Sequence, residues 1–388
     1  MIPRVAPRLA LTLLLAVSLS LPAAAQNAVQ LENQKQGTAD WEAFPEASNR
    51  EIEGYASLTS VDRGGTINFY VNTAEPSYAL EIFRLGWYNG LGARRVLGPV
   101  TRPGVVQTTP APDANGMVEC NWTAPYTLTI PNSSDVTDWA SGVYVVRLTG
   151  SQSNKKRFIF FVVRDDARAS NHYFISAVNT SQAYNNWGGK SLYTFNSTNA
   201  VAATKISLNR PLANGAGTGD FIFRWEYDML RFLEREGYDV TYGTDVDLHE
   251  RGNLLLNHRD VLIVGHSEYW SYAMRQNVEA ARDQGVNLGF FAGNSVYWQI
   301  RYEPSPVSGF ADRTIVGYKE TALTKDPYAT DKDSTNNKYI TTSWRSSTLN
   351  DSEDALVGTL YFYDDTNCCG DITIDDVTSA PWVFANTG

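Results

Sequence analysis

The sequence predicts a protein in two parts, an antiparallel β-sandwich followed by an α/β domain built on a parallel sheet. Between about residues 50 and 165, short segments alternate apolar and polar residues and show no helical period. From about residue 170 onward, continuous apolar segments alternate with amphipathic ones, which is typical of a parallel sheet covered by helices. We therefore expect a leader at 1–25, a sandwich domain at 26–166 and an α/β domain at 167–388.

The first 25 residues have the composition of a secretory signal peptide. Arg4 and Arg8 precede an apolar stretch at 9–21, and three alanines at 23–25 form a small-residue cleavage site. The apolar stretch is shorter than the roughly 20 residues that a membrane span needs. The sequence thus predicts a secreted or periplasmic protein that leaves the membrane after cleavage.

Composition excludes some classes of partner. The chain has 388 residues and a formal charge of −10, which argues against nucleic-acid binding because that needs a basic surface. Hydrophobic residues make up 43% and aromatic residues 12%, enough for a sizeable core. Cys120 is isolated and Cys368 and Cys369 are adjacent, a spacing that makes no zinc site and favours free or partly paired structural cysteines.

The strands expected in the first part are short and separated by turn residues. Such a series indicates an immunoglobulin-like or lectin-like sandwich. The predicted strands are 57–61, 66–71, 78–85, 142–148 and 157–163.

The second part alternates strands with helices. The segment 260–265 is apolar throughout, as expected for a strand buried on both faces. This alternation predicts a doubly wound parallel sheet. We expect further strands at 172–178, 238–242 and 286–293, and helices at 226–235 and 272–284.

Polar side chains follow several of these strands directly. Ligands bind beyond the carboxyl ends of parallel strands, so we expect these side chains at one edge of the sheet. If the extended backbone continues past Gly265, His266 and Glu268 point the same way and offer an imidazole and a carboxylate to one metal ion. Tyr184, after the neighbouring strand, would add a phenolate oxygen suited to a ferric ion. The alternative is a histidine that is satisfied by an acidic partner.

Other chemistry at this edge has weaker signals. The sequence has no Gly-x-Ser-x-Gly elbow, the motif of many serine hydrolases. Ser267 as a nucleophile, with His249 or His258 as its base, is therefore a weak alternative. Asp245 and Asp247 have the oxygens that Ca²⁺ prefers, but two carboxylates alone are more typical of a solvated loop. We expect His249 and His258 at the surface.

At these residues the chain resembles the large (β) subunit of N,N-dimethylformamidase and the group that shares its C-terminal domain. The resemblance runs from about residue 50 to the end, and it implies a β-sandwich joined to a glutamine-amidotransferase-like α/β domain. The matching stretches are 86–95, 183–193, 265–271 and 293–298.

The resemblance also implies a site and a reaction. It implies that Tyr184, His266 and Glu268 hold a mononuclear iron (Fe³⁺), that Asn294 orients the substrate, and that a formamide-type C–N bond is hydrolysed. The family enzyme works with a small partner subunit. Family members usually continue past the position of residues 382–388 into a glycine-rich segment with a further acid, so either the proton-transfer acid expected there is missing or the chain is a fragment. Glu303 is the nearest acid that we can offer for proton transfer.

The sequence therefore predicts an exported, iron-dependent hydrolase of a small amide, which works with a small partner subunit or as a homo-oligomer. One alternative is a non-catalytic secreted protein with a vestigial site, in which the sandwich and the many Trp and Tyr residues bind glycan or peptide. Another is an inactive, truncated homologue that binds metal weakly.

Overall fold

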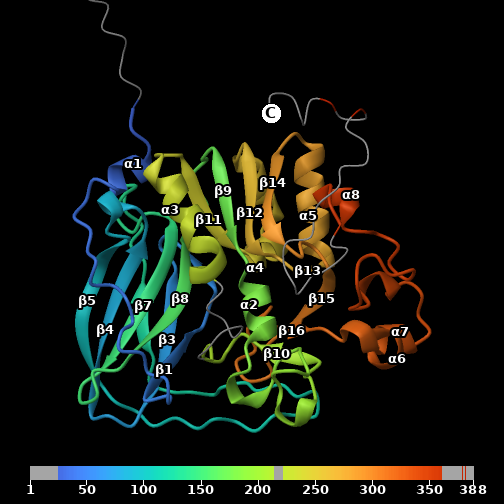
Figure 1. Cartoon of the computed structure of the whole chain (residues 1–388), viewed down its shortest axis with the longest axis horizontal. Helices are drawn as coiled ribbons and strands as arrows, with labels where there is room; N and C mark the ends of the chain where they lie inside the picture. The colour runs from blue at the N-terminus through green and yellow to red at the C-terminus, as the bar shows by residue number, and fades with distance from the viewer. Residues whose placement is uncertain (1–24, 214–221, 361–377, 379–380, 382–388) are drawn as a thin grey trace, which may run out of the picture.

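The computed structural model describes residues 25–213 and 222–360, together with 378 and 381. The predicted leader therefore lies almost entirely outside the described residues, as do Cys368, Cys369 and residues 382–388. The described part is a mixed α/β fold that contains four β-sheets (Figure 1). None of its helices has the length and apolar character needed to cross a membrane.

Two sheets form the first part of the fold. A three-stranded antiparallel sheet has the order β1 (Ile52–Ala56), β3 (Thr66–Thr73), β6 (Tyr126–Thr129). The second sheet has five strands, antiparallel except for the β2–β8 pair. Its order is β2 (Ser60–Asp62), β8 (Lys156–Arg164), β7 (Gly142–Gly150), β4 (Ser77–Leu85), β5 (Ala93–Pro103).

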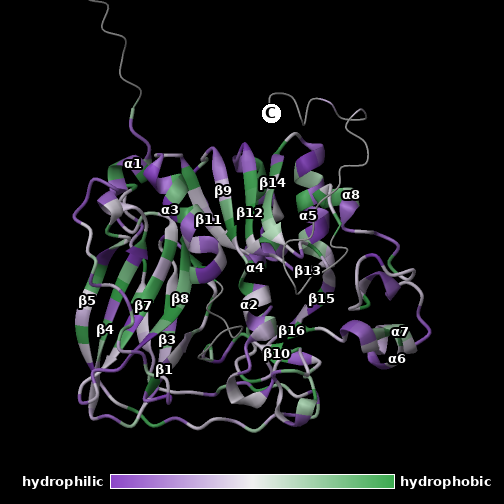
Figure 2. Ribbon diagram, viewed as in Figure 1, coloured by the Kyte–Doolittle hydropathy of each residue, from purple (hydrophilic) through white to green (hydrophobic). Residues whose placement is uncertain are grey.

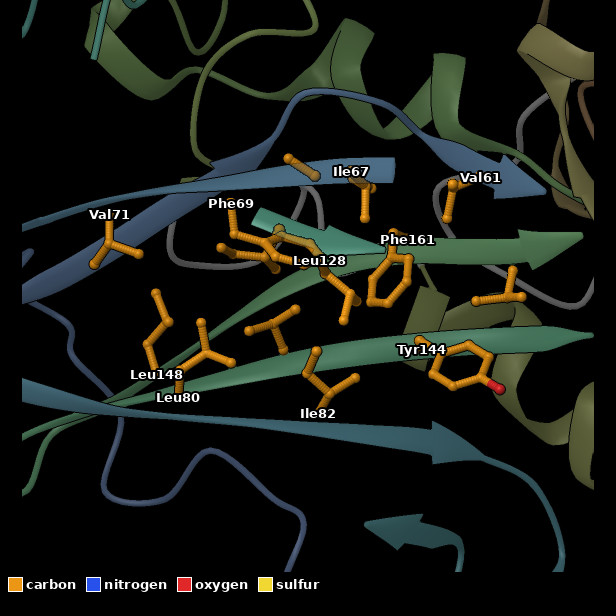
Figure 3. Close-up of a cluster of buried hydrophobic side chains, with 14 of the residues drawn as sticks. Val61, Ile67, Phe69, Val71, Leu80, Ile82, Leu128, Tyr144, Leu148 and Phe161 are labelled. Carbon is orange, nitrogen blue, oxygen red and sulfur yellow. The ribbon is translucent and has the colours of Figure 1, made fainter. Parts of the chain in front are cut away.

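These two sheets enclose an apolar core. Along β3 every second residue is buried, so Ile67, Phe69 and Val71 point inward while their neighbours are more exposed. They meet Leu80 and Ile82 of β4 and further side chains from β7 and β8 (Figure 3). The predicted packing of two mainly antiparallel sheets is thus present. The strands are longer than expected in the second sheet, where β4, β5, β7 and β8 have nine to eleven residues, and β7 is buried on both faces.

A four-stranded parallel sheet follows. Its order is β11 (Val240–Thr244), β9 (His172–Ser176), β12 (Asp260–His266), β14 (Asn287–Gly293). Strand β9 comes first along the chain. Strand β11, the next in the chain, lies on one side of β9, and β12, which follows β11, lies on the other side. The order therefore reverses between β9 and β12, and at such a switch point a crevice opens beyond the strand ends.

The parallel sheet is buried on both faces by different partners. One face, which includes Phe174 and Val264, packs on the five-stranded sheet and on α3 (Tyr227–Arg235). The other face, which includes Ile175 and Ile263, packs on α5 (Tyr272–Asp283). Apolar residues accordingly concentrate in the stacked strands (Figure 2). The two predicted parts share one of their cores, which the strand pattern alone did not indicate.

A second four-stranded sheet, with mostly shorter strands, lies beside the carboxyl ends of the parallel strands. Its order is β10 (Lys205–Ser207), β16 (Thr314–Val316), β15 (Trp298–Glu303), β13 (Tyr269–Ser271). The other α-helices of the described chain are α1 (Ala28–Glu32), α2 (Val178–Tyr184), α4 (Asp245–Glu250), α6 (Ala322–Lys325), α7 (Pro327–Thr330) and α8 (Asp354–Val357). A π-helical turn, η4, spans Ile222–Glu226, and short 3₁₀ turns are η1 (Tyr88–Gly90), η2 (Trp187–Gly189), η3 (Thr198–Ala200), η5 (Gly252–Asn257), η6 (Lys319–Thr321) and η7 (Asn337–Tyr339).

Candidate functional site

The carboxyl ends of β9 and β12, at the switch point, bring Tyr184 and Glu268 together. Helix α2 starts just after β9 and ends with Tyr184, while Glu268 follows β12 by two residues. Because β9 and β12 are neighbours, the two segments meet at one edge. The phenol oxygen of Tyr184 lies 3.4 Å from Oε2 of Glu268.

The backbone of Glu268 is held from two directions. Its N–H donates to the hydroxyl of Thr180 on α2, at 3.0 Å. Its carbonyl accepts from the N–H groups of Tyr297 and Trp298, at 3.0 and 2.9 Å. The residue is only 4% exposed, so its carboxyl group is fixed in a site that excludes most water.

Burial changes the acidity of this carboxyl group. Loss of hydration raises the pKa of Glu268 from its ordinary 4.5 to about 7, against the opposing effects of the Lys319 cation and of hydrogen bonds from Tyr193, Tyr184 and Trp298. Oε1 accepts from the Tyr193 hydroxyl at 3.0 Å. A cation at Oε2 would stabilise the ionised form, which the surrounding residues alone stabilise only partly.

His266 is the last residue of β12 and is placed by other contacts. Its ring lies against Trp225 of the π-helical turn, with 4.7 Å between ring centroids, and opposite Gly293 of β14. Gly265 before it has φ +88°, so the extended backbone that we assumed through this stretch is interrupted. Burial lowers the pKa of His266, which favours the neutral imidazole that binds metals.

Gly293 leaves room for the His266 ring. A Cβ at this position would lie 2.9 Å from Cε1 of His266, although the backbone of Gly293 is one that alanine can adopt. We therefore expect Gly293→Ala to fold but to displace the imidazole and weaken metal affinity about 10–100-fold. Titration with metal against a chelator measures this. Gly289→Ala on the same strand is the control, because its Cβ would meet Leu262 and Phe291 instead. Equal affinities for both variants would contradict the expectation.

The two predicted catalytic residues have different surroundings. Asn294 follows Gly293 directly and adopts φ +50°, a left-handed conformation that asparagine tolerates. Glu303 ends β15, five residues or roughly 16 Å along the strand from Trp298, and forms an ion pair with Lys205 at 2.6 Å. Its role in proton transfer stays a prediction.

The structure adds residues that we did not assign from the sequence. Lys319 is 6% exposed, donates to the carbonyl of Leu192 at 3.2 Å, and has its Nζ 3.4 Å from the ring centroid of Tyr193. Tyr193 and Lys319 also line a cleft with a volume of about 490 Å³. Tyr193 belongs to a stretch that carries the family resemblance, which is a signal we did not use. Lys319 has no such signal.

Two expectations about neighbouring residues are wrong. Asp245 and Asp247 are not solvated, because they are 1% and 2% exposed. Asp247 accepts from the backbone N–H of Thr244, at 2.8 Å, and pairs with Arg164, while Asp245 accepts from the N–H of Asn179 at 2.8 Å. These contacts start α4 and join it to the rest of the fold.

His258 is also not a surface residue. It is 8% exposed, its ring stacks on Tyr173 at 4.7 Å between centroids, and Nδ1 lies 3.0 Å from the hydroxyl of Ser170. The residue packs against β9, which the position of His258 in the sequence did not reveal.

The donor set fits a metal ion. Among the described residues no three His, Cys, Asp or Glu side chains gather, and the candidate donors at this edge include the phenol of Tyr184. The Tyr184 hydroxyl lies 3.4 Å from Oε2 of Glu268, so the two oxygens are close enough for one cation to contact both. Phenolate, carboxylate and neutral imidazole together suit a first-row transition metal.

The fold and this site define a mixed α/β protein with candidate metal ligands at the switch point of a parallel sheet. A family model described as "N,N-dimethylformamidase beta subunit-like, C-terminal" matches residues 79–388, and the chain belongs to this family. No curated protein matches the chain. Among solved structures, a family 123 glycoside hydrolase from Clostridium perfringens has 9% identity and a TM-score of 0.13 over 53% of this chain and 33% of its own, a likeness too low to support any argument.

Proposed function

We propose that this protein is an exported, iron-dependent hydrolase that cleaves the C–N bond of a small amide. The observation that carries the proposal is the contact between Tyr184 and Glu268 at the switch point, where His266 ends β12 two residues before Glu268. Family membership supports an amide as substrate, because the family takes its description from N,N-dimethylformamidase, an enzyme named for an amide. The charge of the donor set favours Fe³⁺ among the metals that the site would accept.

Each residue has a distinct task in this proposal. Tyr184, His266 and Glu268 would hold the iron, which when bound polarises a carbonyl or lowers the pKa of water. Asn294 would donate a hydrogen bond to the oxygen that gains charge as water adds to the carbonyl carbon. The C–N bond then breaks: the hydroxyl of the added water stays on the carbonyl carbon to give the carboxylic acid, and the second proton of the water goes to the nitrogen, which leaves as the free amine. The burial of Glu268 strengthens these electrostatic effects because little water competes.

The wider context belongs to the same proposal. We propose that the leader at 1–25 directs the chain to the periplasm or the exterior, and that the chain works with a small partner subunit or as a homo-oligomer. We also propose an immunoglobulin-like sandwich and a glutamine-amidotransferase-like second domain. The stacked antiparallel sheets and the β11-β9-β12-β14 order support these two assignments.

The first test is the metal content of the purified mature chain, residues 26–388. We expect near-stoichiometric iron and a visible tyrosinate-to-iron absorption band, both lost in the His266→Ala, Glu268→Ala double variant. His172→Ala is the matched control, because His172 starts β9 at the opposite edge of the sheet and pairs with Asp260. The iron-loaded protein is then assayed for amine release from formamide, N-methylformamide and N,N-dimethylformamide.

Folded wild-type protein that takes up no iron and has no absorption band would end the iron hypothesis. Glycan and peptide binding arrays then become the test of the non-catalytic alternative. Iron uptake without hydrolysis of any amide would support the inactive homologue instead.

A further inference from the structure

A small cavity lies where the first part of the fold meets the α/β part. Its volume is about 80 Å³. An engineered apolar cavity of about 150 Å³ binds benzene, so this cavity has room for a ligand of roughly three to five non-hydrogen atoms. Most of its wall is apolar, with side chains from β7 and β8 on one side and from the α/β part on the other. These side chains include Val143, Phe158, Phe160, Leu208, Leu212 and Ile222.

Two buried guanidinium groups also line the cavity, those of Arg210 and Arg313. The two residues are 1% and 4% exposed. Among the described residues, no carboxylate forms an ion pair with either of them. Burial lowers the pKa of both from 12.5 to about 10, so both carry their charge at neutral pH.

Arg210 is held by backbone oxygens instead of an acid. Its two terminal nitrogens donate to four carbonyls at 2.8 to 3.3 Å, and its Nε has no hydrogen-bond partner. The accepting residues are Gln182, Asn185, Trp187 and Lys190. Carbonyl dipoles stabilise a guanidinium but do not neutralise it. The positive charge of Arg210 therefore remains uncompensated beside the cavity.

Arg313 has a nitrogen that the protein leaves unused. Its Nε donates to Oδ1 of Asn209 at 2.9 Å, and its Nη2 donates to the carbonyls of Ala56 and Leu208, each at 3.1 Å. Its Nη1 forms no hydrogen bond within the described part of the chain. A buried cation with an unused donor at the wall of a cavity is suited to an anionic acceptor.

The balance of charge around the cavity decides the sign of the ligand. Glu226 is the acidic side chain among the described residues that line it, and it is 2% exposed. Even when Glu226 is ionised, it compensates only one of the two guanidinium charges. The excess of positive charge favours an anion. The apolar wall favours a carboxylate with a short hydrocarbon tail over an inorganic ion, which has no apolar part to bury.

We propose that this cavity binds a small monocarboxylate of about two or three carbons. Its carboxylate accepts from Nη1 of Arg313, and its hydrocarbon part contacts the apolar wall. Because both parts of the fold line the cavity, the ligand stabilises their packing on each other. Tyr184, His266 and Glu268 do not line it, so the inference does not depend on the proposed iron site.

Propionate is the probe for the test, and propionamide, which has the same shape without the charge, is the control ligand. Binding to the purified mature chain is measured by calorimetry and by the rise in Tm. A chelator is present because a bound metal would itself take a carboxylate. We expect propionate to bind with a Kd of roughly 10 µM to 1 mM, as small ligands do. Propionamide and chloride should bind at least about 10-fold more weakly.

The Arg313→Met variant removes the charge and the unused donor but keeps much of the side-chain volume. We expect propionate affinity to fall about 10–100-fold, and Arg313→Lys, which keeps a charge, to retain part of it. Arg147→Met is the matched control. Arg147 is also buried, at 3% exposed, but it pairs with Glu81 at 2.6 Å and does not line the cavity. This variant should lose stability without losing propionate affinity.

Several results would overturn the proposal. They are an absence of propionate binding, equal responses to propionate, propionamide and chloride, and equal propionate affinities for the wild type and Arg313→Met. The comparison of ligands uses the wild type alone, so it decides the question even if Arg313→Met does not fold. Because the chelator removes iron, none of these results bears on the proposed function.

Discussion

Replacing Glu234 with glutamine is expected to destabilise the folded protein by about 3–5 kcal/mol. Arg84 of β4 and Glu234 of α3 form a bidentate pair with N–O distances of 2.6 and 2.9 Å, and both side chains are 0% exposed. Glutamine has no charge, so the variant leaves the guanidinium buried without its closest partner. Tyr242, which donates to Oε1 of Glu234 at 2.9 Å, would have to rearrange as well.

Urea unfolding of the wild type and the variant measures this loss. Glu236→Gln is a control from the chain segment that directly follows α3, because Glu236 pairs with Arg235 while both are about half exposed, and such pairs contribute about 0–1 kcal/mol. A double variant with Arg84→Met and Glu234→Leu should recover much of the stability, since it leaves no unpaired charge. Equal losses for Glu234→Gln and Glu236→Gln would refute the argument.

The surroundings of this ion pair give a structural role to residues 86–95, to which the proposed chemistry assigns no role. The residues at 86–95 carry part of the family resemblance, and they begin two positions after Arg84. Tyr88 donates to Oε1 of Glu32 at 2.7 Å, and Arg94 pairs with the same oxygen at 2.6 Å. The stretch therefore ties α1 to the five-stranded sheet beside α3. Its role is structural.

The second large effect is the pH dependence that Glu226 imposes on stability. Glu226 is 2% exposed, accepts from the Ser176 hydroxyl at 2.6 Å and from the N–H of Ala177 at 3.0 Å, and its burial raises the pKa from 4.5 to about 7. Below pH 4.5 the residue is protonated in both states and costs nothing. As the pH rises toward 7, the unfolded chain releases this proton while the folded protein keeps it. The free energy of unfolding therefore falls by about 3 kcal/mol over this range.

Glu226→Gln is expected to remove this loss. Glutamine does not ionise, and its amide accepts from Ala177 and donates to the Ser176 oxygen. The metal-free variant should match the wild type at pH 4 and exceed its free energy of unfolding by about 3 kcal/mol at pH 8. Urea unfolding at both values measures the difference, and other titrating groups cancel because both proteins share them. A difference that does not change with pH would contradict the assignment.

Much of the fold follows from local patterns. The apolar stretch at 260–265 predicted a strand buried on both faces, and β12 packs against two cores. Helix α5 begins at Tyr272 as expected, because Ser271 caps it by accepting from the N–H of Met274. Strand β1 was missed because all five of its residues are buried, so it lacks the alternation that marked β3.

The site was predictable in part for a related reason. Residues after parallel strands come to one edge whatever the loops do, so Tyr184 and Glu268 were expected near each other, and they are in contact. The fine geometry was not predictable in the same way. Gly265 breaks the extended backbone, and His266 is placed by Trp225 and Gly293 rather than by its spacing from Glu268.

The sequence by itself determined which faces of strands and helices are apolar, the order of the sandwich and the α/β part, and the strand ends that carry polar groups. These features depend on neighbours a few positions apart, so a periodic pattern records them. Only the tertiary structure decided that Lys319 reaches Tyr193, that Arg84 meets Glu234, and that Asp245 is buried. Those contacts join segments that are distant along the chain, and packing of complementary surfaces, which leaves no periodic trace in sequence, brings them together.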